Sequence, residues 1–241
     1  MIITSKQNPH FKELKDLLTK KVRDEKNRFL IFGEDLFEIA EKRGKIIETF
    51  STDANLYYDT TLSEALMKDL TPTVTSYKVG AILEKIDYVS NNNNNIIILD
   101  DVQDPDNVGA IFRSAACFNF DKLLLSNESA DTYNDKTIRA SRGGIFYLEV
   151  RRADLVEEIK SLKEKGYLIV GTEASGIQDL TKIYTSHKYA VIFGNEGKGI
   201  KKEILDLCDF SVGIKIDNLE SLNVAHSASI IMHELRKNQG E

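Results

Sequence analysis

Three polar segments of this 241-residue chain follow apolar runs and carry residue types that can do chemistry. In the first, ILDDVQDPDNVGAIFRSAACF, an apolar run ends at Leu99 and a polar turn with Asp and Pro follows. A helix is predicted to begin near Asn107, because asparagine is a favoured N-cap residue. Arg113 lies six residues further along this helix, so both side chains can border one cleft. A helix cap and a surface arginine are the alternative interpretation of this segment alone.

The second segment, VIFGNEGKGI, ends an apolar run in Gly194, Gly197 and Gly199, with Asn195 and Glu196 between them. Glycine allows positive φ and lets backbone N–H groups come close to a ligand. The spacing fits neither a phosphate loop, which needs Ser or Thr after Gly-Lys, nor the G-x-G-x-x-G dinucleotide fingerprint. A glycine-rich turn with a carboxylate therefore suits a hydroxyl-bearing or cationic ligand better than a triphosphate.

The third segment, IKIDNLESLNVAHSASIIMHEL, places Ser221 and Asn223 at the predicted start of an amphipathic helix. Capping explains one such polar residue but not two. His226 and His233 can share a face of this helix, but neither has an acidic partner at metal-ligand spacing. We therefore interpret them as surface histidines and predict no metal site.

Composition narrows the class of protein. Hydrophobic residues make up 41% of the chain and charged residues 29%, and no apolar run approaches the roughly 20 residues of a spanning helix. The first residues lack a signal-peptide pattern, and Cys117 and Cys208 lie far apart, so we expect a cytoplasmic protein without disulfides. A net charge of −6 argues against a partner held by bulk charge. An RNA-binding hypothesis must therefore rest on local features.

The asparagine run 91–95 is the predicted boundary of two domains, 1–90 and 96–241, because five asparagines cannot build a core. Residues 1–28 contain eight basic and four acidic residues, a net of +4. A solvated helix face and a phosphate-contacting edge both explain this excess.

The apolar pattern predicts an α/β fold in both parts. In the first part, short apolar runs and helical segments alternate at 5–18, 29–32, 36–41, 46–50, 62–70 and 79–86. In the second part, unbroken aliphatic runs indicate a mainly parallel sheet that helices cover on both faces. These predicted strands are 96–99, 123–125, 145–150, 167–171, 189–193 and 210–216. The ligand site of such a sheet lies beyond the carboxyl ends of its strands.

The segments NVGAIFR, GNEGKGI and SLNVAHSAS, in this order, resemble the three motifs of the SpoU/TrmH family of RNA ribose 2′-O-methyltransferases. The stretches IRASRGGIFYLEV and GTEASG also resemble the family, and the N-terminal SKQNPHFKELKDLL is similar to the substrate-binding module of its ribosomal RNA members. The resemblance implies a catalytic α/β domain with a deep trefoil knot and S-adenosyl-L-methionine bound within it. It further implies a homodimer whose active site combines two chains.

By motif position, the resemblance implies an RNA-facing catalytic cluster of Arg113, Asn107, Glu196, Ser221 and Asn223. It implies that the cofactor is held at Thr172, Gly194, Asn195, Gly197, Ile214 and Leu222. Methyl transfer is an in-line displacement that needs alignment and loss of the hydroxyl proton, but no metal. A guanidinium with a pKa above about 12 is a poor base, so we expect Arg113 to hold a phosphate and stabilise charge on the ribose oxygen. The proton acceptor stays open.

Ribosomal RNA is the expected substrate and transfer RNA the alternative. A non-catalytic RNA-binding protein of ribosome assembly is a second class, but binding alone would not need all three motifs. A methyltransferase acting on a small molecule would leave the N-terminal module and its basic segment unexplained.

Overall fold

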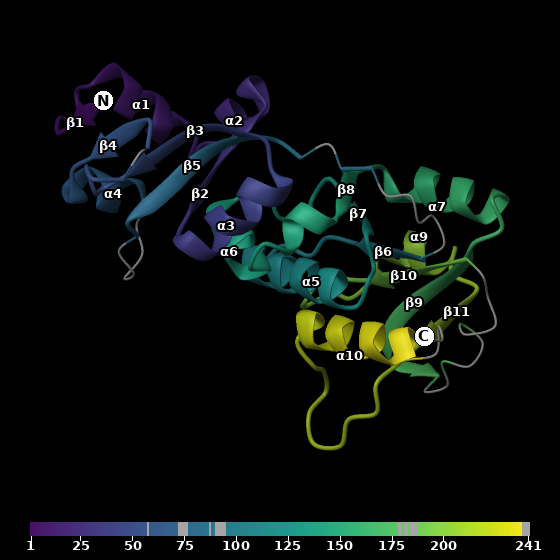
Figure 1. Ribbon diagram of the computed structural model, residues 1–241. Helices are drawn as coiled ribbons and strands as arrows, with labels where there is room; N and C mark the ends of the chain where they lie inside the picture. The colour runs from purple at the N-terminus through teal and green to yellow at the C-terminus, as the bar shows by residue number, and fades with distance from the viewer. Residues whose placement is uncertain are drawn as a thin grey trace.

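The computed structural model describes residues 1–56, 58–71, 77–86, 88–89, 95–177, 180, 183 and 188–237, and it contains two sheets (Figure 1). The first sheet is mixed and has the order β1-β4-β3-β5-β2. Its unit comprises β1 (Ile2–Ile3), α1 (Pro9–Asp16), α2 (Lys20–Lys26), β2 (Arg28–Phe32), α3 (Glu34–Arg43), β3 (Ile46–Ser51), β4 (Thr60–Leu62), α4 (Glu64–Leu70) and β5 (Val79–Glu84). We call these elements the N-terminal unit.

The second sheet has the order β11-β9-β10-β6-β7-β8, and all five of its strand pairs are parallel. Its unit, the C-terminal unit, comprises β6 (Asn95–Leu99), α5 (Pro105–Cys117), β7 (Lys122–Leu125), α6 (Asp135–Ser141), the 3₁₀ helix η1 (Gly144–Tyr147), β8 (Glu149–Arg152), α7 (Leu155–Glu164), β9 (Leu168–Ile177), β10 (Tyr189–Phe193), α9 (Lys202–Leu205), β11 (Phe210–Val212) and α10 (Val224–Lys237). The predicted parallel α/β class is confirmed.

Alternate residues of the central strands face two different helix layers. Ile97 and Val191 pack in the cluster that contains α5 and α10, whereas Ile98 and Ile192 pack in the cluster that contains α7 and α9. Strands β6 and β10 are buried along their whole length as a result. This two-sided burial explains why these runs are continuously aliphatic in the sequence.

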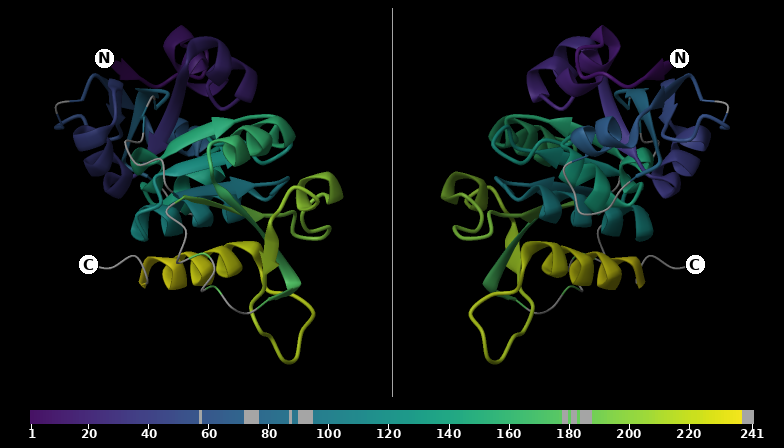
Figure 2. Two further views of the ribbon diagram at one scale, coloured as in Figure 1. Left: turned by 90° about the vertical axis from the view of Figure 1, so that its right-hand side faces the viewer. Right: turned by 90° about the vertical axis from the view of Figure 1, so that its left-hand side faces the viewer.

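The two units share a core. Phe29, Ile31 and Leu83 of the N-terminal sheet belong to the same buried cluster as the residues that α5 packs on β6. The buried side chain of Arg23 crosses the boundary, and its Nη2 lies 2.5 Å from Oδ2 of Asp131. The units are therefore packed against each other rather than joined only by a linker (Figure 2).

Three local predictions need correction. Asn95 is 8% exposed and begins β6, so it is not part of a linker, while residues 90–94 lie outside the described residues. The predicted strand 145–150 is the 3₁₀ helix η1 followed by β8, because Gly143 takes φ +85° and turns the chain at that point. Helix α5 begins at Pro105 with Asp104 as its N-cap, so Asn107 is not the cap.

Within the described part of the chain, no helix combines the length and apolar character needed to cross a membrane.

Candidate active site

A cavity of about 650 Å³ lies where β10 and β11 end and where α10 begins. Its walls are the glycine-rich turn after β10, the segment after β11 and the residues that lead into α10. Residues 213–223, between β11 and α10, form a loop that extends from the body of the molecule (Figures 1 and 2). All six residues predicted to hold a cofactor line this cavity: Thr172, Gly194, Asn195, Gly197, Ile214 and Leu222. Their role in binding stays a prediction.

The glycine-rich turn closes on itself. Asn195 and Gly199 exchange two backbone hydrogen bonds of 3.0 and 2.9 Å, and Gly199 takes φ +71°. A Cβ at Gly194 would lie 2.3 Å from backbone atoms of Gly199 and Ile200, so this position accepts only glycine. Oδ1 of Asn195 accepts hydrogen bonds from the backbone N–H groups of Gly197 and Lys198, both at 3.0 Å. The Asn195 side chain therefore shapes the turn.

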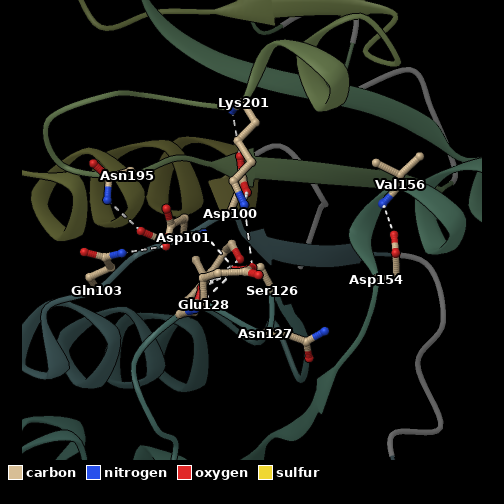
Figure 3. Close-up of polar contacts among 12 residues, drawn as sticks. Asp100, Asp101, Gln103, Ser126, Asn127, Glu128, Asp154, Val156, Asn195 and Lys201 are labelled. Atoms are coloured by element: carbon tan, nitrogen blue, oxygen red, sulfur yellow. Dashed lines mark hydrogen bonds and ion pairs between the residues drawn. The ribbon is translucent and has the colours of Figure 1, made fainter.

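The Asn195 side chain also ties this turn to the loop between β6 and α5. Nδ2 of Asn195 donates to the carbonyl oxygen of Asp101 at 2.8 Å (Figure 3). Asp101 takes φ +59°, an uncommon conformation outside glycine, and its backbone N–H donates to Oγ of Ser126 at 2.9 Å. The loop that leads into α5 is thus held against the cavity wall.

Three of the predicted catalytic residues form one hydrogen-bonded chain. Nδ2 of Asn107 donates to Oε1 of Glu196 at 2.9 Å, and Oδ1 of Asn107 accepts a bond of 2.9 Å from Nδ2 of Asn223. Because Pro105 occupies the first helical position, Asn107 lies inside the first turn of α5, where its buried side chain is free to bridge. The chain joins residues of all three sequence motifs at the edge of the cavity.

Glu196 is fixed as an ionised acceptor. Its carboxylate also accepts the backbone N–H groups of Asp104 at 3.2 Å and Gln103 at 3.4 Å. Partial burial raises the pKa of Glu196, but the hydrogen bond from Asn107 and those from the backbone outweigh it, and the pKa lies below its ordinary value. Glu196 is therefore charged at neutral pH.

Asn223 caps α10. Its Oδ1 accepts the backbone N–H groups of Ala225 at 2.9 Å and His226 at 3.3 Å, while its Nδ2 reaches Asn107. Ser221 lines the same wall of the cavity and is exposed. On the facing side, Oγ1 of Thr172 donates to the carbonyl oxygen of Ile192 at 2.8 Å.

Arg113 lies apart from this cluster. It is exposed on α5 and does not line the cavity of its own chain, and its side chain makes no hydrogen bond or ion pair with the residues that the structure describes. Its backbone packs on η1, since a Cβ at Gly144 would lie 3.0 Å from Cα of Arg113. The structure therefore joins Asn107, Glu196, Asn223 and Ser221 at one place and leaves Arg113 outside it.

Sequence reasoning overlooked Asp100, the last buried residue before the loop. Its Oδ2 accepts the backbone N–H of Lys201 at 2.7 Å, and its Oδ1 lies 3.7 Å from Nζ of the same lysine (Figure 3). Burial raises the pKa of Asp100, against the lowering effect of Lys201. Two aspartates directly after a fully aliphatic strand were the available signal. Among the described residues, no group of three or more His, Cys, Asp or Glu side chains is arranged to hold a metal ion.

A parallel α/β unit with a cavity at its strand ends, and with a hydrogen-bonded polar chain at the edge of that cavity, is the arrangement typical of α/β domains that bind a small ligand. Comparison with known proteins is more specific. Residues 94–233 match the SpoU rRNA Methylase family, and the chain belongs to this family.

One relative covers nearly the whole chain. The 23S rRNA (guanosine(2553)-2′-O)-methyltransferase RlmP of Bacillus subtilis is 32% identical over 247 aligned residues, which span 97% of this chain and 98% of the relative. The similarity therefore includes the N-terminal unit.

Solved structures share the fold over the same extent. An RNA 2′-O ribose methyltransferase superposes with a TM-score of 0.85 at 26% identity and covers 99% of both chains. The AdoMet-bound rRNA methyltransferase of Sinorhizobium meliloti superposes with a TM-score of 0.87 at 24% identity and covers 100% of this chain and 99% of its own. The trefoil knot that the resemblance implies stays a prediction.

Proposed function

We propose that this protein methylates a ribose 2′-hydroxyl of RNA, with S-adenosylmethionine as methyl donor and ribosomal RNA as substrate. The observation that carries the proposal is the chain from Asn223 through Asn107 to Glu196, which brings residues of the three family motifs together beside one cavity. The name of the Bacillus subtilis relative supports ribosomal RNA over transfer RNA.

The cavity suits such a donor. Its volume of about 650 Å³ is within the usual range for small-ligand sites. Apolar side chains of Ile214, Leu222 and Ile231 can pack against a purine ring, and the carboxylates of Glu173 and Glu220 favour a cationic ligand. When bound, S-adenosylmethionine supplies an electrophilic methyl group on a sulfonium.

Glu196 is suited to orienting the ribose. An ionised carboxylate has about four acceptor sites, and two bonds fall on Oε1 but only one on Oε2. Oε2 can therefore accept a bond from a hydroxyl group of the substrate. Its low pKa makes Glu196 a positioning group rather than a strong base.

Arg113 acts in the site of a second copy of the chain. Its guanidinium is exposed and lies outside the cavity lining of its own chain, so in a homodimer it can complete the cavity of the partner. Two exposed apolar side chains, Leu219 in the loop before α10 at 77% and Ile230 on α10 at 42%, are suited to an interface between copies. There Arg113 holds the adjacent phosphate by its two-pronged donor geometry and stabilises negative charge on the ribose oxygen.

The N-terminal unit binds the RNA substrate in this proposal, and the protein acts in the cytoplasm, where ribosomal RNA is available. Both statements rest on the proposed substrate.

Incubation with methyl-labelled S-adenosylmethionine and RNA from cells that lack the protein tests the function. We expect label in ribosomal RNA, in a dinucleotide that survives alkaline hydrolysis, because alkali cleavage needs a free 2′-hydroxyl. Label in transfer RNA alone would show that transfer RNA, not ribosomal RNA, is the substrate. Cofactor binding without transfer to any RNA would favour the non-catalytic RNA-binding alternative.

A further inference from the structure

The 3₁₀ turn η1 lies where the two units meet, is buried except at its last residue, Tyr147, and has an arginine at each end. At its start, the Cβ position of Gly144 faces the backbone of Arg113 at 3.0 Å. At its end, the guanidinium of Arg43, the last residue of α3, lies 3.9 Å from the centroid of the Tyr147 ring. Residues i and i+3 eclipse in a 3₁₀ helix with a rise of roughly 2 Å per residue, so Tyr147 projects on the side of Gly144 about 6 Å further along the axis.

The arginines around this turn lack strong acidic partners. Arg43 and Arg113 are exposed, and their guanidinium groups form no hydrogen bond or ion pair with the described residues. Arg142, just before the turn, reaches only the highly exposed Asp35, at 3.5 Å. By contrast, Lys15 of the basic N-terminal segment is paired with Asp69 at 2.5 Å. Three exposed arginines therefore lie beside η1 in a protein whose net charge is −6, and their single ion pair within the described part of the chain joins Arg142 to an exposed aspartate.

The stack on Tyr147 preorganises Arg43 for an anion. A guanidinium that lies over a ring uses one face, while its N–H donors stay in its plane and available. Tyr147 is 39% exposed, so a second planar group can reach its side chain from solvent. An arginine fork beside an aromatic ring is the chemistry that binds the phosphate and base of an unpaired nucleotide.

We propose that the Arg43–Tyr147 pair binds a single-stranded nucleotide of the RNA substrate, next to the nucleotide that Arg113 holds. Arg43 binds the phosphate and Tyr147 stacks on the base. This rests on the proposed function, since the place of Arg113 at the reacting ribose belongs to it. The pair would make the seam between the units part of the substrate-binding surface.

The competing explanation is that the pair only clamps α3 to η1. Dissociation constants for ribosomal RNA, measured by filter binding with the full chain and S-adenosylhomocysteine present, separate the two. We expect Tyr147→Ala and Arg43→Ala each to weaken RNA binding about tenfold, the scale of losing one stacked base. Tyr147→Phe keeps the ring and should bind within twofold of wild type, whereas Arg43→Lys keeps charge without the fork and should fall between.

Lys165→Ala is the matched control, because Lys165 is an exposed cation at the end of α7, on the other helix layer of the sheet. It should leave RNA affinity unchanged. Affinity for S-adenosylmethionine and kcat at saturating RNA should stay within twofold of wild type in all these variants, so that the loss appears in KM.

Wild-type RNA affinity in both alanine variants, with a lowered unfolding temperature, would overturn the proposal in favour of the clamp. Equal losses in Tyr147→Phe and Tyr147→Ala would also contradict it, because the ring would not matter. A wild type that binds RNA but transfers no methyl group would refute the proposed function and leave the binding comparison interpretable. A wild type that binds no RNA would refute both.

Discussion

At the scale of single residues, Asn107 connects two groups that both lie far from it in the sequence. One amide side chain donates to Glu196 and accepts from Asn223, so its two polar ends are used at once. Aspartate cannot replace it, since a second carboxylate facing Glu196 would donate nothing. The requirement at this position is therefore for an amide, not for a polar residue in general.

Asn107→Ala should lower the free energy of unfolding by about 1–3 kcal/mol, because it leaves partners without their buried bonds. Methyl transfer should fall as well, since Glu196 would keep only its backbone donors. Urea unfolding and initial rates measure the two effects. Gln103→Ala is the control, because Gln103 contacts Glu196 only through its backbone N–H and the substitution removes only an exposed side-chain bond to Asp101. An equal loss in both variants would contradict the assigned role of the amide.

The lowered pKa of Glu196 predicts a pH-dependent contribution to stability. The folded pKa lies below the unfolded value of about 4.3, so ionisation stabilises the fold above that value and the stabilisation is lost as pH falls through the folded pKa. The difference in unfolding free energy between wild type and Glu196→Gln should be constant from about pH 6 to 8 and shrink below about pH 4.3. A difference in unfolding free energy that grows on acidification would show that the pKa of Glu196 is raised in the folded protein, not lowered.

At the scale of elements, the glycine-rich turn and the loop after β6 form the wall of the cavity together. Asn195 is their junction, because its side chain caps the turn and reaches the carbonyl oxygen of Asp101. The turn has so little room at Gly194 that the backbone itself sets the shape of the site. The shape of the turn therefore depends on the absence of a side chain at Gly194 and on the hydrogen bonds of the Asn195 side chain.

Gly194→Ala should open the turn, since its Cβ would lie 2.3 Å from the backbone of Gly199 and Ile200. We expect at least a tenfold loss of S-adenosylmethionine affinity by calorimetry, together with a lower unfolding temperature. Gly197→Ala is the matched control, because its Cβ would meet nothing nearer than Oδ1 of Asn195 at 3.8 Å. It should unfold like wild type. Equal stability of the two variants would contradict this prediction, because it would mean that the turn can accommodate a Cβ at position 194.

Sequence patterns predicted the elements that are buried along their whole length. They failed where a residue next to the segment determined its backbone conformation. The aliphatic runs of β6 and β10 predicted buried parallel strands, and the spacing of the glycines predicted the turn after β10. The run 145–150 was equally apolar, yet Gly143 at positive φ made part of it a 3₁₀ turn. Likewise, residue type favoured Asn107 as a cap, but Asp104 before Pro105 was better placed.

The site could be predicted only in part, because its contacts join residues that are distant in the sequence. Each motif contributes one partner to the chain from Asn223 to Glu196, and Asn107 lies 89 positions from Glu196 and 116 from Asn223 in the sequence. Their resemblance to a family suggested the grouping, but local pattern could not. The contacts of Asp100 with Lys201 and of Asp101 with Asn195 depend on tertiary packing between β6 and the turn after β10. Nothing in the local sequence fixes such contacts.

At the scale of the whole molecule, the ion pair between the buried Arg23 and the partly buried Asp131 holds the N-terminal unit to the C-terminal unit. Arg23 also donates to the carbonyl oxygens of Leu17 and Leu18. The loop that carries Asp131 is braced by Arg152, whose guanidinium donates to the carbonyl oxygens of Ser126 and Ser129, among others. The relative position of the two units is thus built into the fold.

Asp131→Asn should cost about 3–5 kcal/mol of unfolding free energy, because a buried guanidinium would lose its charge partner. The control is Asp35→Asn, which removes the exposed partner of Arg142 and should cost less than about 1 kcal/mol. Urea unfolding at one protein concentration measures both. Similar small effects would show that the contact between the units does not depend on this pair.

The central claim is that residues of the three motifs form one site for ribose methylation, with Arg113 completing it. Single-turnover transfer to ribosomal RNA by wild type and Arg113→Lys tests this most directly, with 2′-O-methylated nucleosides counted after digestion. The account predicts that wild type forms a 2′-O-methylated nucleoside and that the lysine variant is roughly 10²–10³-fold slower, with unchanged affinity for S-adenosylmethionine, because lysine keeps the charge but loses the fork. Near wild-type rates in the variant, or a methyl group on a base instead of the ribose, would contradict it.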